Sequence, residues 1–358
     1  MFPHRAVAWI LASTGTAPGE LDRVAMHSVH MPSPKDKDAI LAEYAATESV
    51  GTRLKRVLKK TPALAVHRKR RRAERLAEVA RAGLPLDRTE FVDHHTCHAA
   101  AAFHGSPWRS GKVLVLTADG AGDGLCATVR LGVDGVLGPP IASVDESNSI
   151  GSIYAKVTFL LGMVPNEHEY KLMGLAPYAP ESGAREAYEK FRGLVAASGP
   201  DGLSWRRAPG VPATYYSYRF FRDRLERLRF DWIAAGLQRF VEEHLEAWVL
   251  AAIHATGVRR LALGGGVFMN VKANQRIAAH PDVEGVFVFP SCGDESNAIG
   301  AAFHVYAGRR GGGPAIPPIG PVYWGPDLGE AEIDSAIRGL DARGVSVRRP
   351  ERIEDAVA

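Results

Sequence analysis

The sequence is poor in cysteine and in net charge, and it has no long apolar run. Its 358 residues include only Cys97, Cys126 and Cys292, an odd number with no close pairing. We therefore expect no disulfide framework, and we expect a reducing compartment. The formal net charge of +4 argues against a nucleic-acid-binding protein. No stretch reaches the length of about 18 apolar residues that a membrane span needs.

The composition is that of an ordinary globular protein. Apolar residues make up 46% of the chain and charged residues 23%, which argues against disorder. The N-terminal residues lack the charged and then apolar build of a signal peptide. Because domains typically run about 100–200 residues, the length fits two domains or one large bilobal unit. We expect a cytoplasmic protein that binds neither membranes nor nucleic acid.

Residues 91–103 are the most informative stretch, because an apolar and acidic lead-in meets three histidines and an alanine run. Alanine favours a helix, and His94 and His98 are four residues apart, so both rings would lie on one helix face. Two neutral imidazoles one turn apart are a common pair of metal ligands. For an isolated pair the alternative is a polar helix start whose histidines cap the helix or form local hydrogen bonds.

An apolar, β-rich run at residues 112–118 stops at Asp119. A glycine-rich turn and a second apolar run at 125–131 follow, which predicts a hairpin. A carboxylate at the end of a buried strand, beside glycines that let a ligand approach, is a common device for binding a phosphate or a metal. The alternative is an acidic residue that serves only the turn, and Asp123 fits that alternative.

The middle of the chain gives weaker signals. Lys171 lies among polar residues before an apolar Leu-Met-Gly-Leu run, where it either faces an anionic ligand or lies on a helix surface. The basic stretch 53–75 is interpreted as a solvated helix face, with a phosphate-binding patch as the alternative. Residues 179–218 are rich in proline and glycine and poorly periodic, which indicates a variable insertion. Residues 231–255 predict the longest helix.

A strand, a turn and a helix follow one another twice in the last third of the chain. Residues 260–277 place three glycines between the predicted strand and helix, and free amides at a helix N-terminus bind anions or nucleotides. The pattern is neither a P-loop nor a dinucleotide fingerprint. Residues 286–303 repeat the design and place Asp294 at a second junction between strand and helix.

Five motifs in a fixed order resemble the O-carbamoyltransferase family of nodulation-factor and antibiotic-tailoring enzymes. They are 94–103 (HHTCHAAAAF), 117–120 (TADG), 171–176 (KLMGLA), 264–270 (GGGVFMN) and 293–302 (GDESNAIGAA). The relatives share an α/β, actin-like fold of two RNase-H-like lobes, which is also used by tRNA threonylcarbamoyl-transfer proteins. The resemblance implies the same fold class here.

The resemblance also implies roles for particular residues. It implies a divalent metal, with iron expected and zinc as the alternative, bound by His94, His98, Asp119 and Asp294. It implies that the nucleotide contacts Gly264, Gly265, Gly266 and Asn270. It further implies that Lys171 contacts the carbamoyl or phosphate end, and that His95 contacts the substrate or the carbamoyl group.

The implied reaction starts from carbamoyl phosphate and ATP, which form carbamoyl adenylate. This mixed anhydride then gives its carbamoyl group to a hydroxyl of a sugar or natural product. The metal would hold the adenylate phosphate and polarise the carbonyl, while a nearby histidine takes the hydroxyl proton. The expected partners are therefore carbamoyl phosphate, ATP and a small-molecule hydroxyl acceptor.

The two ends of the chain depart from the family pattern. We expect a first lobe at 1–150 without its opening strands, a second lobe at 151–320, and at 321–358 the start of a linker to an adenylate-forming domain. This predicts that the isolated chain makes no carbamoyl adenylate, and that a separate domain or a homodimer completes it. The alternatives are a non-catalytic remnant or partner subunit that binds nucleotide and metal, and, ranked lower, an actin-fold kinase or ATPase.

Overall fold

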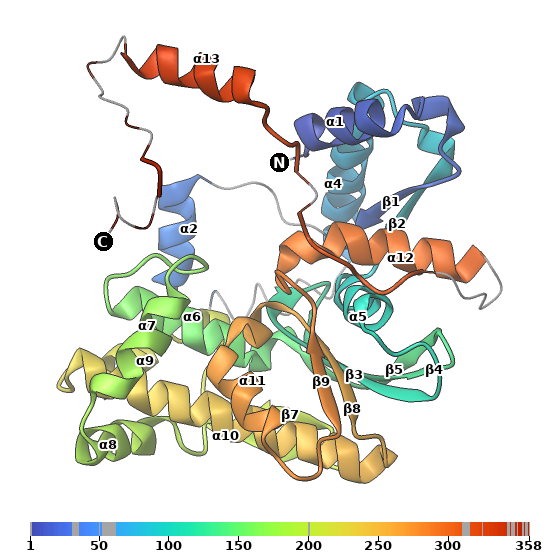
Figure 1. Cartoon of the computed structure of the whole chain (residues 1–358). Helices are drawn as coiled ribbons and strands as arrows, with labels where there is room; N and C mark the ends of the chain where they lie inside the picture. Colours follow the sequence, from blue (N-terminus) through green and yellow to red (C-terminus); the bar gives the residue numbers. More distant parts are fainter. Residues whose placement is uncertain are drawn as a thin grey trace. The chain divides into compact units, whose positions relative to one another are not determined.

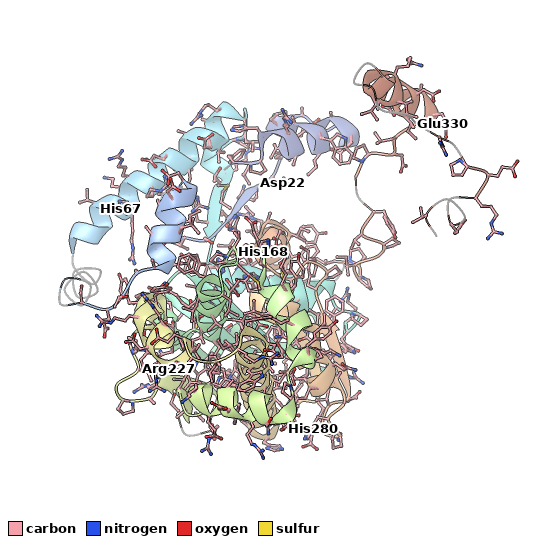
Figure 2. All side chains as sticks on the ribbon, turned by 90° about the vertical axis from the view of Figure 1, so that its left-hand side faces the viewer. Asp22, His67, His168, Arg227, His280 and Glu330 are labelled. Atoms are coloured by element: carbon pink, nitrogen blue, oxygen red, sulfur yellow. The ribbon has the colours of Figure 1, made fainter. Side chains whose placement is uncertain are left out.

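The computed structural model describes most of the chain, in two units. The described residues are 2–30, 36–49, 51, 62–199, 201–309, 316–323, 325–341, 344, 348, 350–352, 354 and 357. One compact unit comprises Met1–Ile319, and the other comprises Gly320–Ala358 with helix α13 (Glu330–Asp341), where Figure 2 labels Glu330. Within these described ranges, no helix combines the length and the apolar character needed to cross a bilayer. The cysteines Cys97, Cys126 and Cys292 are buried and free.

A mixed five-stranded sheet forms the centre of the first unit (Figure 1). Its strand order is β5-β4-β3-β8-β9, with β3, β4 and β5 antiparallel and β3, β8 and β9 parallel. The strands are β3 (Lys112–Gly122), β4 (Leu125–Val133), β5 (Val136–Asp145), β8 (Arg260–Gly264) and β9 (Gly285–Val288). The fold is therefore α/β with a central mixed sheet, which confirms the α/β part of the predicted fold class.

Helices pack on both faces of this sheet (Figure 1). On one side lie α5 (His94–Gly105) and α12 (Asn297–Arg309), which pack against each other. The helices of the other side are α6 (Ile150–Leu160), α7 (Glu169–Leu175), α8 (Glu181–Phe191), α9 (Tyr218–Leu225), α10 (Phe230–Thr256) and α11 (Val271–Ala278). The helix predicted at 231–255 is α10, the longest in the described part of the chain.

The core extends over both faces because side chains alternate along β3. Val113 and Val115 pack with alanines and Phe103 of α5. Leu114 and Leu116 point the other way, into the large cluster built on α6 and α10. By the same alternation, Thr117 and Asp119 lie on the α5 side of the sheet.

The sheet joins parts of the chain that the sequence assigns to different lobes. Strand β3 pairs with β8 in parallel, from Leu114 opposite Leu261 to Thr117 opposite Gly264. Both strands are buried on both faces, and such apolar runs pair with each other as parallel strands. The boundary predicted at residue 150 therefore falls between strands of one sheet and does not separate two sheets.

The N-terminal part of this unit is smaller and contains a two-stranded sheet. Its elements are α1 (His4–Thr14), β1 (Val24–His27), α2 (Lys37–Tyr44), α4 (Pro62–Arg81) and β2 (Thr89–Val92). Strands β1 and β2 pair in parallel, and β1 also contacts α12.

Part of the basic stretch lies on α4, where Figure 2 labels His67. Arg68, Lys69 and Arg70 are exposed, and Arg70 pairs with Glu74 at 3.0 Å. Residues 68–70 are thus a solvated helix face, as the first interpretation expects, whereas Arg75 at the end of the stretch is buried. Residues 52–61, which include Lys59 and Lys60, lie outside the described residues.

The stretch 179–218 is more regular than its composition predicts. It contains α8 and a hairpin of β6 (Val195–Ser198) and β7 (Ser204–Arg207). The glycine and proline content of this stretch suggests a loop, but Gly183 lies within α8, where it is needed for close packing. A Cβ on Gly183 would lie 2.4 Å from the Trp232 ring, so glycine lets α8 lie directly against α10.

We predict that Gly300→Ala destabilises the protein because it separates α12 from α5. A Cβ at this position would lie 1.9 Å from the Cys97 carbonyl oxygen, so backbone must move. Overpacking of this kind costs about 1–3 kcal/mol, measured as the free energy of unfolding in a denaturant titration. The matched control is Gly308→Ala on the same helix, where a Cβ meets no atom within 4 Å. This control should be as stable as wild type or more stable, and equal losses in both variants would contradict the packing argument.

Candidate metal centre

The site begins at the N-terminus of α5, which is capped by an aspartate. The Asp93 carboxylate accepts a hydrogen bond from the Thr96 amide at 2.9 Å. The histidines are therefore not the capping residues, and the alternative of a histidine cap does not hold. Every residue of α5 is buried. Its alanine run packs on the sheet, while His94 and His98 project one turn apart, as their spacing predicts.

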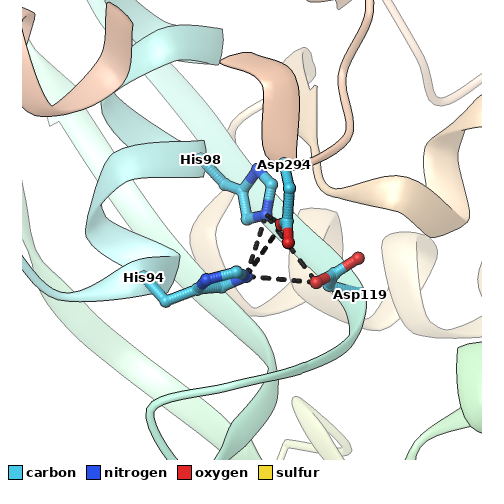
Figure 3. A group of neighbouring side chains, drawn as sticks. All are labelled: His94, His98, Asp119 and Asp294. Carbon is cyan, nitrogen blue, oxygen red and sulfur yellow. Dashed lines mark hydrogen bonds and ion pairs between the residues drawn. The ribbon is translucent and has the colours of Figure 1, made fainter. Parts of the chain in front are cut away.

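Four side chains from three separated segments converge on one point (Figure 3). His94 and His98 come from α5, Asp119 from β3 and Asp294 from the turn before α12. Their nitrogen and oxygen atoms all lie within 4.8 Å of one another. The Nε2 atom of His94 lies 3.1 Å from Nε2 of His98, 3.1 Å from Asp119 Oδ2 and 3.3 Å from Asp294 Oδ1.

The dimensions of this cluster fit one cation. Atoms held about 2.0–2.2 Å from an ion lie about 2.8–3.6 Å from one another when they are neighbours in octahedral or tetrahedral coordination. Nε2 of His98 lies 3.4 Å from Asp294 Oδ1 and 3.8 Å from Asp119 Oδ2, close to that range. Two imidazoles and two carboxylates suit iron or zinc. The four residues therefore fit a divalent metal by donor type and by spacing.

The electrostatics of the cluster also call for a positive charge at its centre. Burial lowers the pKa of His98, but hydrogen bonds and charges from Asp119 and Asp294 outweigh it and raise the pKa to about 9. Burial raises the pKa of Asp119, but the two histidines outweigh it and hold the pKa well below its usual value. Without a metal, the proton on His98 supplies the charge that two neighbouring carboxylates attract.

Further contacts hold the two carboxylates in place. The Gly266 amide donates to Asp119 Oδ1 at 3.0 Å, which leaves Oδ2 toward the histidines. The buried Asn297 side chain donates to Asp294 Oδ1 at 3.1 Å. Such outer contacts orient ligands and tune their basicity. Asp119 lies where β3 departs from regular pairing with β4, rather than at the strand end that the sequence predicts. A bulge of this kind can redirect a side chain.

The glycines at 264–266 are occupied by protein contacts. Gly265 has a φ of +99°, and a Cβ there would lie 2.3 Å from the Ala118 carbonyl oxygen. A Cβ on Gly264 would lie 2.8 Å from the His98 carbonyl oxygen, and one on Gly266 would lie 2.9 Å from Asp119 Oδ1. The Gly265 amide donates to the Cys292 carbonyl at 2.8 Å. These glycines therefore permit the close approach of α5 and β3 to the turn after β8.

The helix that follows this turn begins later than the sequence predicts. A short 3₁₀ turn (Gly266–Met269) separates the glycines from α11, whose N-cap is Asn270. Asn270 Oδ1 accepts from the Ala273 amide at 3.1 Å, and its amide group donates to Gln238 at 3.0 Å. The side chain proposed to contact a nucleotide thus also caps a helix and binds α10.

His95 lies beside the cluster, with the centre of its ring 5.3 Å from that of His94 and 6.1 Å from that of His98, whereas no contact joins Lys171 to the four residues in the described part of the chain. The His95 ring is fully buried, and Nδ1 lies 2.9 Å from Thr117 Oγ1. Burial and the neighbouring histidines lower the pKa of His95 to about 4. The ring has no exposed surface in this structure, and the predicted contact of His95 with the substrate or the carbamoyl group stays a prediction. Lys171 is exposed on α7, with its ammonium 5.8 Å from the centre of the Tyr170 ring.

Sequence reasoning missed the residues that surround the ligands. Asp123, interpreted as a turn residue, accepts hydrogen bonds from the amides of Val29, His30 and His94 at 2.8, 2.5 and 2.8 Å. It therefore ties the start of α5 to the segment after β1. Asn297 lies inside the motif 293–302, so its position beside Asp294 and its side-chain amide could have indicated that it contacts a ligand. Ser28, whose hydroxyl lies 3.0 Å from His94 Nδ1, gave no signal in the sequence.

The chain belongs to the carbamoyltransferase family. The family model described as "Carbamoyltransferase N-terminus" matches residues 2–303. The nodulation protein NolNO of Sinorhizobium fredii is 32% identical over 246 residues, which cover 68% of this chain and 35% of that protein. The nodulation protein NolO of Bradyrhizobium diazoefficiens is 30% identical over 273 residues, covering 75% of this chain and 47% of that protein.

The chain therefore spans less than half the length of these two relatives. Among solved structures, full-length HypF in its phosphate- and nucleotide-bound form superposes with a TM-score of 0.42 at 16% sequence identity. The superposition covers 62% of this chain and 43% of HypF. The family model and the two nodulation proteins agree with the family that the five sequence motifs resemble.

We predict a pH effect on the metal-free protein that depends on His98. Its folded pKa of about 9 exceeds the ordinary value of 6.5, so its stabilising contribution is complete below pH 6.5 and is lost as the pH rises through 9. The loss of this contribution should therefore lower the thermal unfolding midpoint as the pH rises from 6.5 to 9. Asp294→Asn removes one carboxylate beside the ring and should reduce that decrease. Identical pH slopes in wild type and variant, both freed of metal by a chelator, would contradict the assignment.

Proposed function

We propose that this chain carries the carbamoyl-transfer site of an O-carbamoyltransferase. The observation that carries the proposal is the convergence of His94, His98, Asp119 and Asp294, in a member of the carbamoyltransferase family. The proposed reaction passes a carbamoyl group from carbamoyl phosphate, through carbamoyl adenylate, to a hydroxyl of a sugar or natural product. The two-lobed actin-like arrangement and a cytoplasmic location belong to the same proposal, and the free cysteines support the latter.

The four converging residues would hold a divalent metal, for which we propose iron, with zinc as the alternative. When bound, such an ion supplies a Lewis acid that polarises a carbonyl or phosphoryl oxygen. The chain's own contribution is to fix the ligands. Gly266 and Asn297 orient the carboxylates, and the buried α5 keeps water from the imidazole side.

The transfer step itself makes one bond and breaks another. The acceptor oxygen bonds to the carbamoyl carbon, the bond from that carbon to the adenylate oxygen breaks, and AMP leaves. The proton of the acceptor hydroxyl passes to water in the same step, so the products are the carbamate, AMP and one proton. His95 is buried and has a lowered pKa, so we do not assign it as the base.

The nucleotide is proposed to bind beside the turn of Gly264, Gly265 and Gly266, with Asn270 at its end. The contacts of these residues with Ala118, His98 and Asp119 place that turn directly against the metal cluster, which supports the proximity of the two sites. Substituting the glycines would disturb this packing together with any nucleotide contact. A surface residue therefore gives a cleaner test of nucleotide binding than Gly265.

The proposal predicts transfer from supplied carbamoyl adenylate to a hydroxyl compound. Full-length chain loaded with Fe²⁺ would be incubated with carbamoyl adenylate and a panel of sugars and polyols. Mass spectrometry should detect acceptors that have gained one carbamoyl group, with release of AMP. Asp119→Asn should lower this rate by at least about tenfold, because it weakens a ligand that is itself fixed by Gly266.

Two outcomes of this assay would count against the proposal. Equal rates in wild type and Asp119→Asn would remove the metal cluster from the reaction. Binding of metal and ATP without transfer to any acceptor, also after addition of the protein encoded by the adjacent reading frame, would favour the non-catalytic partner subunit.

Lys171 offers the separate test of anion binding. Because its side chain is exposed, Lys171→Ala should leave the thermal unfolding midpoint unchanged. If the ammonium contacts a phosphate, the variant should bind ATP or carbamoyl phosphate several-fold more weakly in calorimetry. Lys112→Ala, another exposed lysine at the start of β3, is the matched control and should bind as wild type does. Equal affinities in all three proteins would assign Lys171 to the helix surface.

A further inference from the structure

The segment that follows β1 reaches the back of the metal cluster. Ser28 is 4% exposed, and its hydroxyl oxygen lies 3.0 Å from Nδ1 of His94 and 3.3 Å from Nδ1 of His27. His94 lies 66 residues further along the chain. Its Nε2 atom faces the converging carboxylates, so Ser28 contacts the opposite nitrogen of the same ring.

Two charged side chains hold Ser28 in this position. The guanidinium of Arg75, on α4 and only 7% exposed, donates to the Ser28 carbonyl at 2.6 Å and also to the His27 carbonyl. The Asp123 carboxylate accepts from the amides of Val29 and His30, and from the amide of His94. One carboxylate thus fixes both the segment after β1 and the first residue of α5.

The backbone of Ser28 is in the left-handed region, with a φ of +62°. Glycine adopts this conformation without cost, whereas a residue with a Cβ is strained there. A serine at such a position is explained by its side chain, because glycine would serve the turn better. The hydroxyl is buried between the imidazoles of His27 and His94, so its role is to form hydrogen bonds with these two rings.

Metal binding would fix the direction of these hydrogen bonds. A neutral imidazole that offers Nε2 to a metal carries its proton on Nδ1. The Nδ1–H of His94 then donates to Ser28 Oγ, and the hydroxyl hydrogen of Ser28 is left to donate to Nδ1 of His27. Burial and the charge of Arg75 lower the pKa of His27, which favours the neutral ring that can accept.

We propose that Ser28 is a positioning residue that holds His94 in the tautomer and ring orientation required of a metal ligand. It does so as the middle member of a series of two hydrogen bonds, from His94 Nδ1 to Ser28 Oγ and from Ser28 Oγ to His27 Nδ1. The proposal rests on the proposed metal centre, and it extends that centre to a strand of the N-terminal part of the chain. Ser28 touches neither metal nor substrate.

The test measures metal binding directly. Metal-free full-length chain is titrated with Co²⁺, and the visible absorption of the bound ion reports both the dissociation constant and the coordination. Ser28→Ala should raise the dissociation constant by about tenfold or more and shift the absorption bands. Ser28→Gly should weaken binding to the same extent, although it relieves the left-handed strain and should be at least as stable as Ser28→Ala.

The matched control is Ser106→Ala, at the opposite end of α5. Ser106 is fully buried, and its hydroxyl donates to the Phe103 carbonyl at 2.7 Å, so the variant also loses a buried hydroxyl hydrogen bond. It should bind Co²⁺ as wild type does. Thermal unfolding of every variant separates a loss of affinity from a loss of fold.

Each result decides between specific ideas. Weak binding by both Ser28 variants, with normal binding by Ser106→Ala, supports the proposal. If Ser28→Gly binds like wild type, only the backbone conformation matters and the role of the hydroxyl is overturned. If both Ser28 variants bind like wild type, the positioning role is overturned while the metal centre stands. If wild-type protein does not bind Co²⁺, the metal centre itself fails, and this inference fails with it.

Discussion

The site depends on close backbone contacts that only glycine allows. Helix α5 must approach β3, the turn after β8 and α12 for its two histidines to meet two aspartates. A Cβ on Gly122 would lie 2.1 Å from the His94 ring, and one on Gly300 would lie 1.9 Å from the Cys97 carbonyl. Together with Gly264, these residues let β3, α12 and the turn after β8 pack closely against α5. The convergence of the four side chains thus follows from packing distance, because imidazole and aspartate side chains are too short to bridge wider gaps.

The same contacts change the meaning of the triple-glycine motif. Free amides before a helix are a common anion site, and the motif alone favours that use. Here the amides of Gly265 and Gly266 already donate to Cys292 and to Asp119. The turn therefore shapes the metal cluster whether or not a phosphate also binds near it. A glycine substitution that abolishes activity would not by itself identify a nucleotide contact.

Local pattern predicted the elements that carry the ligands. Alanine-rich spacing placed His94 and His98 on one helix face, and apolar runs located β3, β4 and α10. Tertiary pairing was beyond such patterns. Ser28 meets His94 only because β1 pairs with β2, which leads directly into α5. The order in residues 179–218 was also missed, since Gly183 is needed for packing against Trp232 and resembles a loop residue in the sequence.

The four candidate ligands differ in how open they are to solvent. The side chains of His94, His98 and Asp119 are 5%, 0% and 14% exposed, whereas that of Asp294 is 63% exposed. Solvent therefore reaches the cluster beside Asp294. A Cβ on the preceding Gly293 would lie 2.6 Å from the Met269 methyl group, so this approach lies next to the end of the triple-glycine motif. The motifs 264–270 and 293–302 therefore meet beside the most exposed of the four side chains, although they are separate in the sequence.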